Sequence, residues 1–151
     1  VARRVGGKEQ VIRLADEEAT IAFGAELLRQ VQQRYGGNAL IFLHGELGAG
    51  KTTLVRGVLR ALGHSGPVKS PTYTLLEPYR LNGQDAFHFD LYRVQDPEEL
   101  SFVGFDEIID GSGLKLIEWP DKADHWLPKP QIELRLEVVS DTERVIHADF
   151  F

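Results

Sequence analysis

The sequence contains neither cysteine nor methionine. Without cysteine the chain can form no disulfide, no thiolate metal site and no cysteine nucleophile, so three classes of mechanism are excluded together. Because methionine is missing even at position 1, we expect a trimmed or processed start. No apolar run approaches the roughly 20 residues that span a bilayer, and residues 1–13 lack the apolar core of a signal peptide. We therefore expect a cytoplasmic protein with no membrane partner.

The chain also has no surplus of positive charge. It carries 17 Lys and Arg against 23 Asp and Glu, for a net charge of -6. No cluster of basic residues is dense enough to cover several phosphates, which disfavours tight, direct binding of RNA or DNA. A length of 151 residues with 42% hydrophobic and 26% charged residues is typical of one globular domain. We expect a single domain over residues 1–151, with residues 1–10 flexible.

Apolar patterns alternate between strand and helix along the chain. They predict strands at residues 11–14, 39–44, 72–80, 86–92, 114–117, 132–139 and 145–150. They predict helices at residues 17–34, 51–62 and 96–110, and one or two helical turns at 121–127. Asp16 is a suitable N-cap for the first helix. The Asn82-Gly83 pair predicts one hairpin, and the alternating strands at the end of the chain predict a second.

Residues 45–52 read GELGAGKT and satisfy the pattern GxxxxGK[ST] in full. Glycines let successive backbone N–H groups point at a phosphate, and the helix that follows adds the positive end of its dipole. Lys51 supplies a full charge to the β and γ phosphates, and Thr52 offers a hydroxyl to Mg²⁺. The predicted contacts to nucleotide are therefore Glu46, Leu47, Gly48, Ala49, Gly50, Lys51, Thr52 and Thr53.

The order of strand, glycine-rich loop and helix is the one that such a loop requires. A chance match to the pattern in a chain of this length is of order 1%. We therefore predict an α/β fold: a single-domain P-loop NTPase with a mixed parallel and antiparallel sheet flanked by helices.

Hydrolysis requires more than a phosphate loop, and two carboxylates follow apolar runs at predicted strand ends. Asp90 ends FHF and Glu118 ends LKLI, so each could hold Mg²⁺ or orient the attacking water. An ordinary surface acid at a strand exit is the alternative for each. Thr72 is the candidate hydroxyl for the γ-phosphate and Mg²⁺, against a plain loop threonine. Arg93 could stabilise negative charge or be an exposed arginine.

Two other side chains near these acids have more than one interpretation. His88 lies inside a strand, and we interpret it as a packed, hydrogen-bonded histidine rather than a base. Trp119 adjoins Glu118 and could cover the nucleotide, face a partner or simply pack in the core.

The segments GELGAGKTT, SPTYTLL, FHFDLYR and LIEWPDK resemble, in that order and spacing, the bacterial TsaE (YjeE) ATPases of tRNA threonylcarbamoyladenosine synthesis. The likeness spans almost the whole chain, although the first segment alone is shared by many families. The resemblance implies ATP and Mg²⁺ as ligands. It also implies TsaD and TsaB as partner proteins, which transfer the threonylcarbamoyl group, with tRNA contacted only indirectly.

The resemblance also implies roles for individual residues. Lys51 and Thr52 correspond to the phosphate and Mg²⁺ positions, Glu118 to the family's metal-linked acid and Asp90 to its hydrolytic aspartate. Trp119 would cover the site. The base would lie near the first helix and the final hairpin, which points to Thr20 and Arg144. The departures from the family's pattern are Glu46 for the commoner Asp and Tyr73 for the commoner Phe, and neither removes a phosphate contact.

Three other functions are compatible with a phosphate loop. A small-molecule kinase needs a lid and an acceptor pocket, for which the roughly 60 residues after Asp90 leave little room. A GTP-dependent switch module is disfavoured because the chain has Asp90-Leu91-Tyr92-Arg93 where such proteins have DxxG, and no NKxD for guanine. A nucleotide-binding regulatory subunit without turnover of its own stays open, since no arginine finger is evident.

Overall fold

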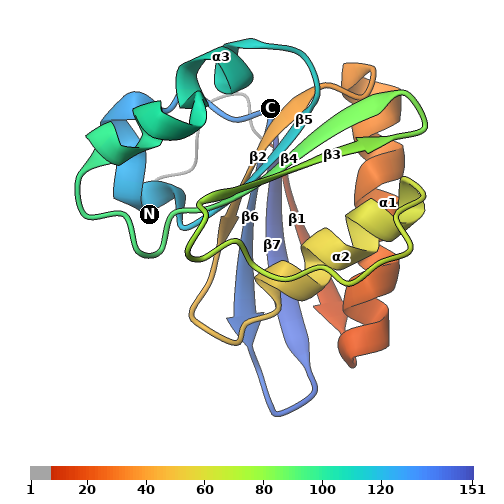
Figure 1. The fold of residues 1–151 in the computed structure, drawn as a ribbon. Coiled ribbons are helices and arrows are strands. Elements are labelled where there is room, and N and C mark those ends of the chain that lie inside the picture. Colours follow the sequence, from red (N-terminus) through yellow and green to blue (C-terminus); the bar gives the residue numbers. More distant parts are fainter. Residues whose placement is uncertain (1–7) are drawn as a thin grey trace.

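A computed structural model describes residues 8–151 of the chain. Seven strands form one sheet in the order β1-β7-β6-β2-β5-β4-β3, with helical segments on both of its faces (Figure 1). The strands are β1 (Lys8–Leu14), β2 (Ala39–His44), β3 (Leu76–Leu81), β4 (Gln84–Asp90), β5 (Leu114–Glu118), β6 (Ile132–Val138) and β7 (Arg144–Phe150). The helical segments are α1 (Glu17–Tyr35), α2 (Lys51–Ala61), η1 (Pro97–Val103), α3 (Phe105–Asp110) and η2 (Pro120–Trp126), of which η1 and η2 are 3₁₀ helices.

The sheet is mixed, which confirms the predicted fold class. Strand β2 lies parallel to both β5 and β6, and β4 lies parallel to β5. The pairs β1–β7, β6–β7 and β3–β4 are antiparallel and include both predicted hairpins. Because β2, β4 and β5 run in the same direction, their carboxyl ends meet at one edge of the sheet.

Each face of the sheet carries its own hydrophobic core. In β2, Ile41 and Leu43 pack toward α1 and α2, whereas Leu40 and Phe42 pack toward η1, α3 and η2. Both sets are buried, as the continuous apolar run of this strand predicts for a strand covered on both faces. The loop that follows β2 is therefore anchored to the centre of the molecule.

Helices α1 and α2 lie against one another on one face of the sheet (Figure 1). The predicted N-cap is confirmed, since the Asp16 carboxylate accepts a hydrogen bond of 2.9 Å from the backbone N–H of Ala19. The two helices touch where Gly24 faces Gly57. A Cβ atom at position 57 would lie 2.3 Å from the carbonyl oxygen of Ile21, so glycine permits this close crossing.

Three predicted boundaries are wrong. The strand predicted from residue 72 begins only at Leu76, because residues 71–75 form a turn in which the N–H of Leu75 bonds the Pro71 carbonyl at 2.8 Å. The helix predicted over residues 96–110 is divided into η1 and α3 by Gly104, whose φ is 70°.

The third wrong boundary is at the start of the first strand. Strand β1 begins at Lys8, so residues 8–10 of the segment expected to be flexible pair with β7, while residues 1–7 lie outside the described part. Within residues 8–151, no helix is both long and apolar enough to cross a membrane.

Candidate active site

The glycine-rich loop connects the carboxyl end of β2 to the start of α2. Gly48 and Gly50 have φ values of 81° and 105°, a backbone conformation that residues other than glycine rarely adopt. At Gly45 the constraint is space, because a Cβ atom would lie 2.9 Å from the carbonyl oxygen of Leu136. The glycines of the sequence pattern therefore serve both the bend of the loop and its close approach to β6.

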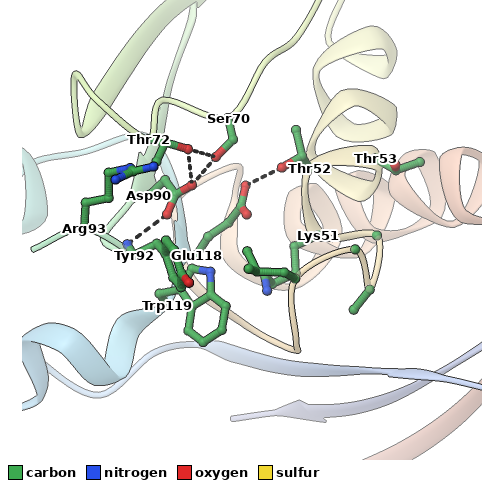
Figure 2. Close-up of a pocket in the computed structure, with 14 residues that line it drawn as sticks. Lys51, Thr52, Thr53, Ser70, Thr72, Asp90, Tyr92, Arg93, Glu118 and Trp119 are labelled. Carbon is green, nitrogen blue, oxygen red and sulfur yellow. Dashed lines mark hydrogen bonds between the residues drawn. The ribbon is translucent and has the colours of Figure 1, made fainter.

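A cleft of about 430 Å³ opens between this loop, residues 70–72 and the ends of β4 and β5. Figure 2 shows side chains from all of these segments around the cleft. Most of the predicted site residues line it: Leu47, Gly48, Ala49, Gly50, Lys51, Thr52, Thr53, Thr72, Asp90, Glu118 and Trp119. The parallel arrangement of β4 and β5 explains the meeting of the two acids, since Asp90 and Glu118 are partners in the strand register.

Lys51 is buried at the start of α2 and bends back over its own loop. Its ammonium group donates to the carbonyl oxygens of Gly45 and Glu46, the latter at 3.1 Å, and lies 4.1 Å from the centre of the Trp119 ring. Burial lowers the pKa of Lys51, while the negative charges of Glu118 and Asp90 act in the opposite direction. The ammonium thus lies against the first residues of the loop, where the negative charges of both carboxylates attract it.

Glu118 ends β5 and is almost completely buried. Its Oε2 atom accepts a hydrogen bond of 3.0 Å from the hydroxyl of Thr52 and lies 2.6 Å from Nε2 of His88. The histidine is hydrogen-bonded and packed, as we interpreted it, but its partner belongs to the cleft. Sequence alternation carried a signal for this contact, because residues 88 and 90 of one strand lie on the same face.

Asp90 is held by two hydroxyls and a backbone amide. Its Oδ2 atom accepts hydrogen bonds from Ser70 and, at 3.2 Å, from Thr72, and its Oδ1 atom accepts one of 2.9 Å from the N–H of Tyr92 (Figure 2). Sequence reasoning selected Thr72 from this segment and missed Ser70. Both belong to the same SPT motif, so the motif itself was the available signal.

Aromatic side chains form one wall of the cleft. Trp119 has a φ of 59°, which is unusual for a residue with a side chain, and its ring lies 4.9 Å from that of Tyr92. Arg93 also lines the cleft. Its guanidinium stacks 4.6 Å from the ring centre of Tyr73, an exposed side chain, and donates to the Tyr73 hydroxyl at 3.3 Å. Of these aromatic side chains, Trp119 is the one that covers Lys51, whose ammonium group lies 4.1 Å from the centre of its ring.

Thr20 and Arg144 do not line the main cleft. They lie in an adjoining cleft on the far side of the loop, with Gly48, Gly50 and Thr53. Arg144 donates to the carbonyl oxygens of Ala49 at 3.1 Å and Gly48 at 3.3 Å, so it holds the loop from β7. These contacts link the final hairpin to the predicted phosphate site.

Glu46 is also absent from the lining of the main cleft. Glu46 lines a third hollow, between the loop and β6, together with His44 and Arg135. His44 Nε2 lies 2.6 Å from the Glu133 carboxylate, which places it away from the two acids of the cleft. Among the predicted loop contacts, Glu46 thus takes part in the cleft only through its carbonyl oxygen, which accepts from Lys51.

The side chains of the cleft fit a magnesium-bound triphosphate. Thr52, Asp90 and Glu118 present hydroxyl and carboxylate oxygens, the hard donors that Mg²⁺ prefers. Helix α2 begins at the same cleft with no side-chain cap, among residues 8–151, on its backbone N–H groups, and Lys51 adds a positive charge beside them. Phosphate oxygens are anionic, so they are stronger acceptors for the Lys51 ammonium than the neutral carbonyls that it contacts in this structure.

Comparison with known proteins gives consistent results. The family model described as threonylcarbamoyl adenosine biosynthesis protein TsaE matches residues 14–146. The TsaE protein of Haemophilus influenzae is 42% identical over 135 residues, covering 87% of this chain and 84% of its own length. The TsaE protein of Bacillus subtilis is 36% identical over 107 residues, covering 71% and 66%. The crystal structure of YdiB from Bacillus subtilis superposes with a TM-score of 0.76 at 26% identity, covering 95% of this chain and 86% of YdiB.

Proposed function

Because this chain belongs to the TsaE family of tRNA threonylcarbamoyladenosine biosynthesis, we propose that it binds and hydrolyses ATP with Mg²⁺ in the main cleft. The observation that carries the proposal is the convergence on one cleft of a glycine-rich loop, a lysine and two buried carboxylates from adjacent strands. Each of these groups has a separate part in binding or hydrolysis.

Binding falls to the loop and to the start of α2. The backbone N–H groups after Gly48 hold the phosphates, and Lys51 exchanges the loop carbonyls for phosphate oxygens. Thr52 and Glu118, whose side chains lie 3.0 Å apart, would hold Mg²⁺. The chemistry that Mg²⁺ would supply there is neutralisation of charge on the phosphate oxygens.

Hydrolysis falls to Asp90. Its carboxylate accepts hydrogen bonds at both oxygens, which fixes its direction. An ionised carboxylate in this position can accept a hydrogen bond from the attacking water and aim it at the γ-phosphate. Ser70 and Thr72 orient the acid on the side opposite Lys51.

Within the pathway, we place this chain beside TsaD and TsaB. Hydrolysis of ATP by this chain would reset the assembly in which those proteins transfer the threonylcarbamoyl group to tRNA adenosine. The net charge of -6 agrees with contact to tRNA mainly through the partners. Charge supplied by a partner can raise rates of phosphoryl transfer by roughly 10³- to 10⁵-fold, so we expect slow turnover by the isolated chain.

The experiment measures phosphate release and nucleotide affinity for purified variants, with and without TsaD and TsaB. Lys51→Ala should weaken binding of Mg²⁺-ATP, whereas Asp90→Asn and Glu118→Gln should retain much of the binding and lose turnover. Glu107→Gln, an exposed acid on α3, is the matched control and should behave as the wild type.

Three results would count against the proposal or a part of it. Normal turnover in both acid variants would remove the assignment of the hydrolytic groups. Failure of calorimetry to detect Mg²⁺-dependent affinity of the wild type for ATP would remove the nucleotide site altogether. Equal affinity for ATP and GTP would contradict only the expected preference for ATP.

A further inference from the structure

His88 is fully buried in β4, below the floor of the cleft. Its Nε2 atom lies 2.6 Å from Oε2 of Glu118, and it does not line the cleft itself. The histidine therefore cannot touch a nucleotide. It can act on the cleft only through the carboxylate that it contacts.

We propose that His88 is a positioning residue that fixes the Glu118 carboxylate for Mg²⁺, an inference that rests on the proposed function. Two donors, the Thr52 hydroxyl and His88 Nε2, converge on the same oxygen, Oε2. Within the part of the chain that the structure describes, Oε1 of Glu118 accepts no hydrogen bond. One oxygen is thus held on the protein side, and the other stays free to bind a cation.

The other ring nitrogen of His88 indicates which form of the imidazole makes this contact. Nδ1 is buried and has no hydrogen-bond partner among residues 8–151. A proton on Nδ1 would make it a buried N–H donor without an acceptor. Such a donor costs more free energy than a buried nitrogen lone pair that accepts no hydrogen bond. A proton on Nε2 and none on Nδ1 leaves no buried donor of this ring unpaired, and the Nε2–H group then donates to Glu118 Oε2.

Partners of this kind matter because a metal ligand must be held in one orientation. A glutamate has three side-chain torsions, and a hydrogen bond to one oxygen restricts all of them before the cation arrives. The strand pairing makes the contact possible: Asp90 pairs with Glu118 in register, and His88 lies two residues earlier on the same face of β4. One strand therefore supplies both the water-directing acid and the support for the metal-binding acid.

The test compares His88→Leu, which removes the donor at similar volume, with His88→Gln, whose amide N–H can reach the same oxygen. Calorimetry measures the affinity of each variant for a non-hydrolysable ATP analogue at a series of Mg²⁺ concentrations. The quantity compared is the Mg²⁺ concentration that gives half of the maximal increase in affinity. We expect His88→Leu to raise this concentration roughly 10- to 100-fold, to leave affinity without Mg²⁺ unchanged, and His88→Gln to recover most of the loss. His147→Leu is the matched control, because His147 pairs with Glu137 at 3.3 Å outside the main cleft.

A second measurement starts from the wild-type protein, so its first result does not depend on the folding of any variant. Long-range ¹H–¹⁵N correlation spectra of the wild type should show His88 protonated at Nε2, and Glu118→Gln should shift that resonance. In a Glu118→Gln background, His88→Leu should have no further effect on Mg²⁺ dependence. A wild-type Mg²⁺ requirement in His88→Leu, equal losses in the Leu and Gln variants, or a proton on Nδ1 would each overturn the inference while leaving the proposed function intact. No Mg²⁺-dependent binding by the wild type would overturn both.

Discussion

Gly57→Ala should destabilise the protein, although alanine is the better helix former. The Cβ atom of alanine would lie 2.3 Å from the carbonyl oxygen of Ile21 and 2.9 Å from its Cα atom. A carbon and a carbonyl oxygen in contact are normally about 3.3 Å apart or more, so α1 must retreat from α2 by about 1 Å. The obstacle is backbone, which cannot turn aside as a flexible side chain can.

The expected loss follows from two opposing contributions. Forcing extra volume into a close-packed contact costs about 1–3 kcal/mol, and a backbone clash belongs at the upper end of that range. Alanine in a helix interior recovers about 1 kcal/mol relative to glycine. We therefore expect the free energy of unfolding to fall by about 2 kcal/mol.

Urea denaturation followed by circular dichroism measures this loss. Ala25→Gly, at an exposed position of α1, isolates the helix-propensity contribution and should cost about 1 kcal/mol. Because α2 begins at Lys51 and Thr52, the Gly57 variant should also bind Mg²⁺-ATP more weakly than the Ala25 variant. A Gly57→Ala protein as stable as the wild type would refute the reasoning, since it would mean that the helix crossing can widen freely.

Three further predictions concern charge, loop position and core packing. Since burial lowers the pKa of Lys51 below its ordinary value of 10.5, the charged form destabilises the ligand-free fold. Lys51→Met should therefore raise the free energy of unfolding at pH 7. This gain should shrink as the pH rises toward 10.5, because the folded wild type loses the lysine proton at a lower pH than the unfolded chain does, and a gain that stays constant in urea titrations would contradict this. Arg144→Ala should weaken nucleotide binding about tenfold in calorimetry by releasing the Ala49 carbonyl, with Arg144→Lys intermediate. Phe89→Ala, which removes a fully buried ring 5.2 Å from that of Phe105, should cost about 3–5 kcal/mol in the same urea assay.

Local patterns in the sequence predicted the elements that depend on local interactions. The run at residues 39–44 gave the bounds of β2, and Asp16 marked the start of α1. Two of the three wrong boundaries occur where one residue with a left-handed backbone interrupts a pattern, as Leu75 does before β3 and Gly104 does between η1 and α3. Such conformations depend on what the neighbouring chain packs against, which a local pattern does not record.

The site divides in the same way. Lys51 and Thr52 follow from a motif whose geometry is local, and Asp90 and Glu118 follow from apolar runs that end in an acid. The convergence of these groups depends on β4 lying next to β5, a pairing in which each residue of β4 lies beside the residue 28 positions later in the sequence, as Asp90 lies beside Glu118.

The sequence by itself therefore determined the fold class, the glycine-rich loop between β2 and α2, and the two acids at the ends of β4 and β5 that we propose as site residues. Only the tertiary structure decided that His88 supports Glu118, that Ser70 joins Thr72 on Asp90, and that Arg144 holds the loop from the last strand. The physical reason is that a backbone bend or a strand is specified by neighbouring residues, whereas side-chain contacts between distant strands depend on how the whole core is buried.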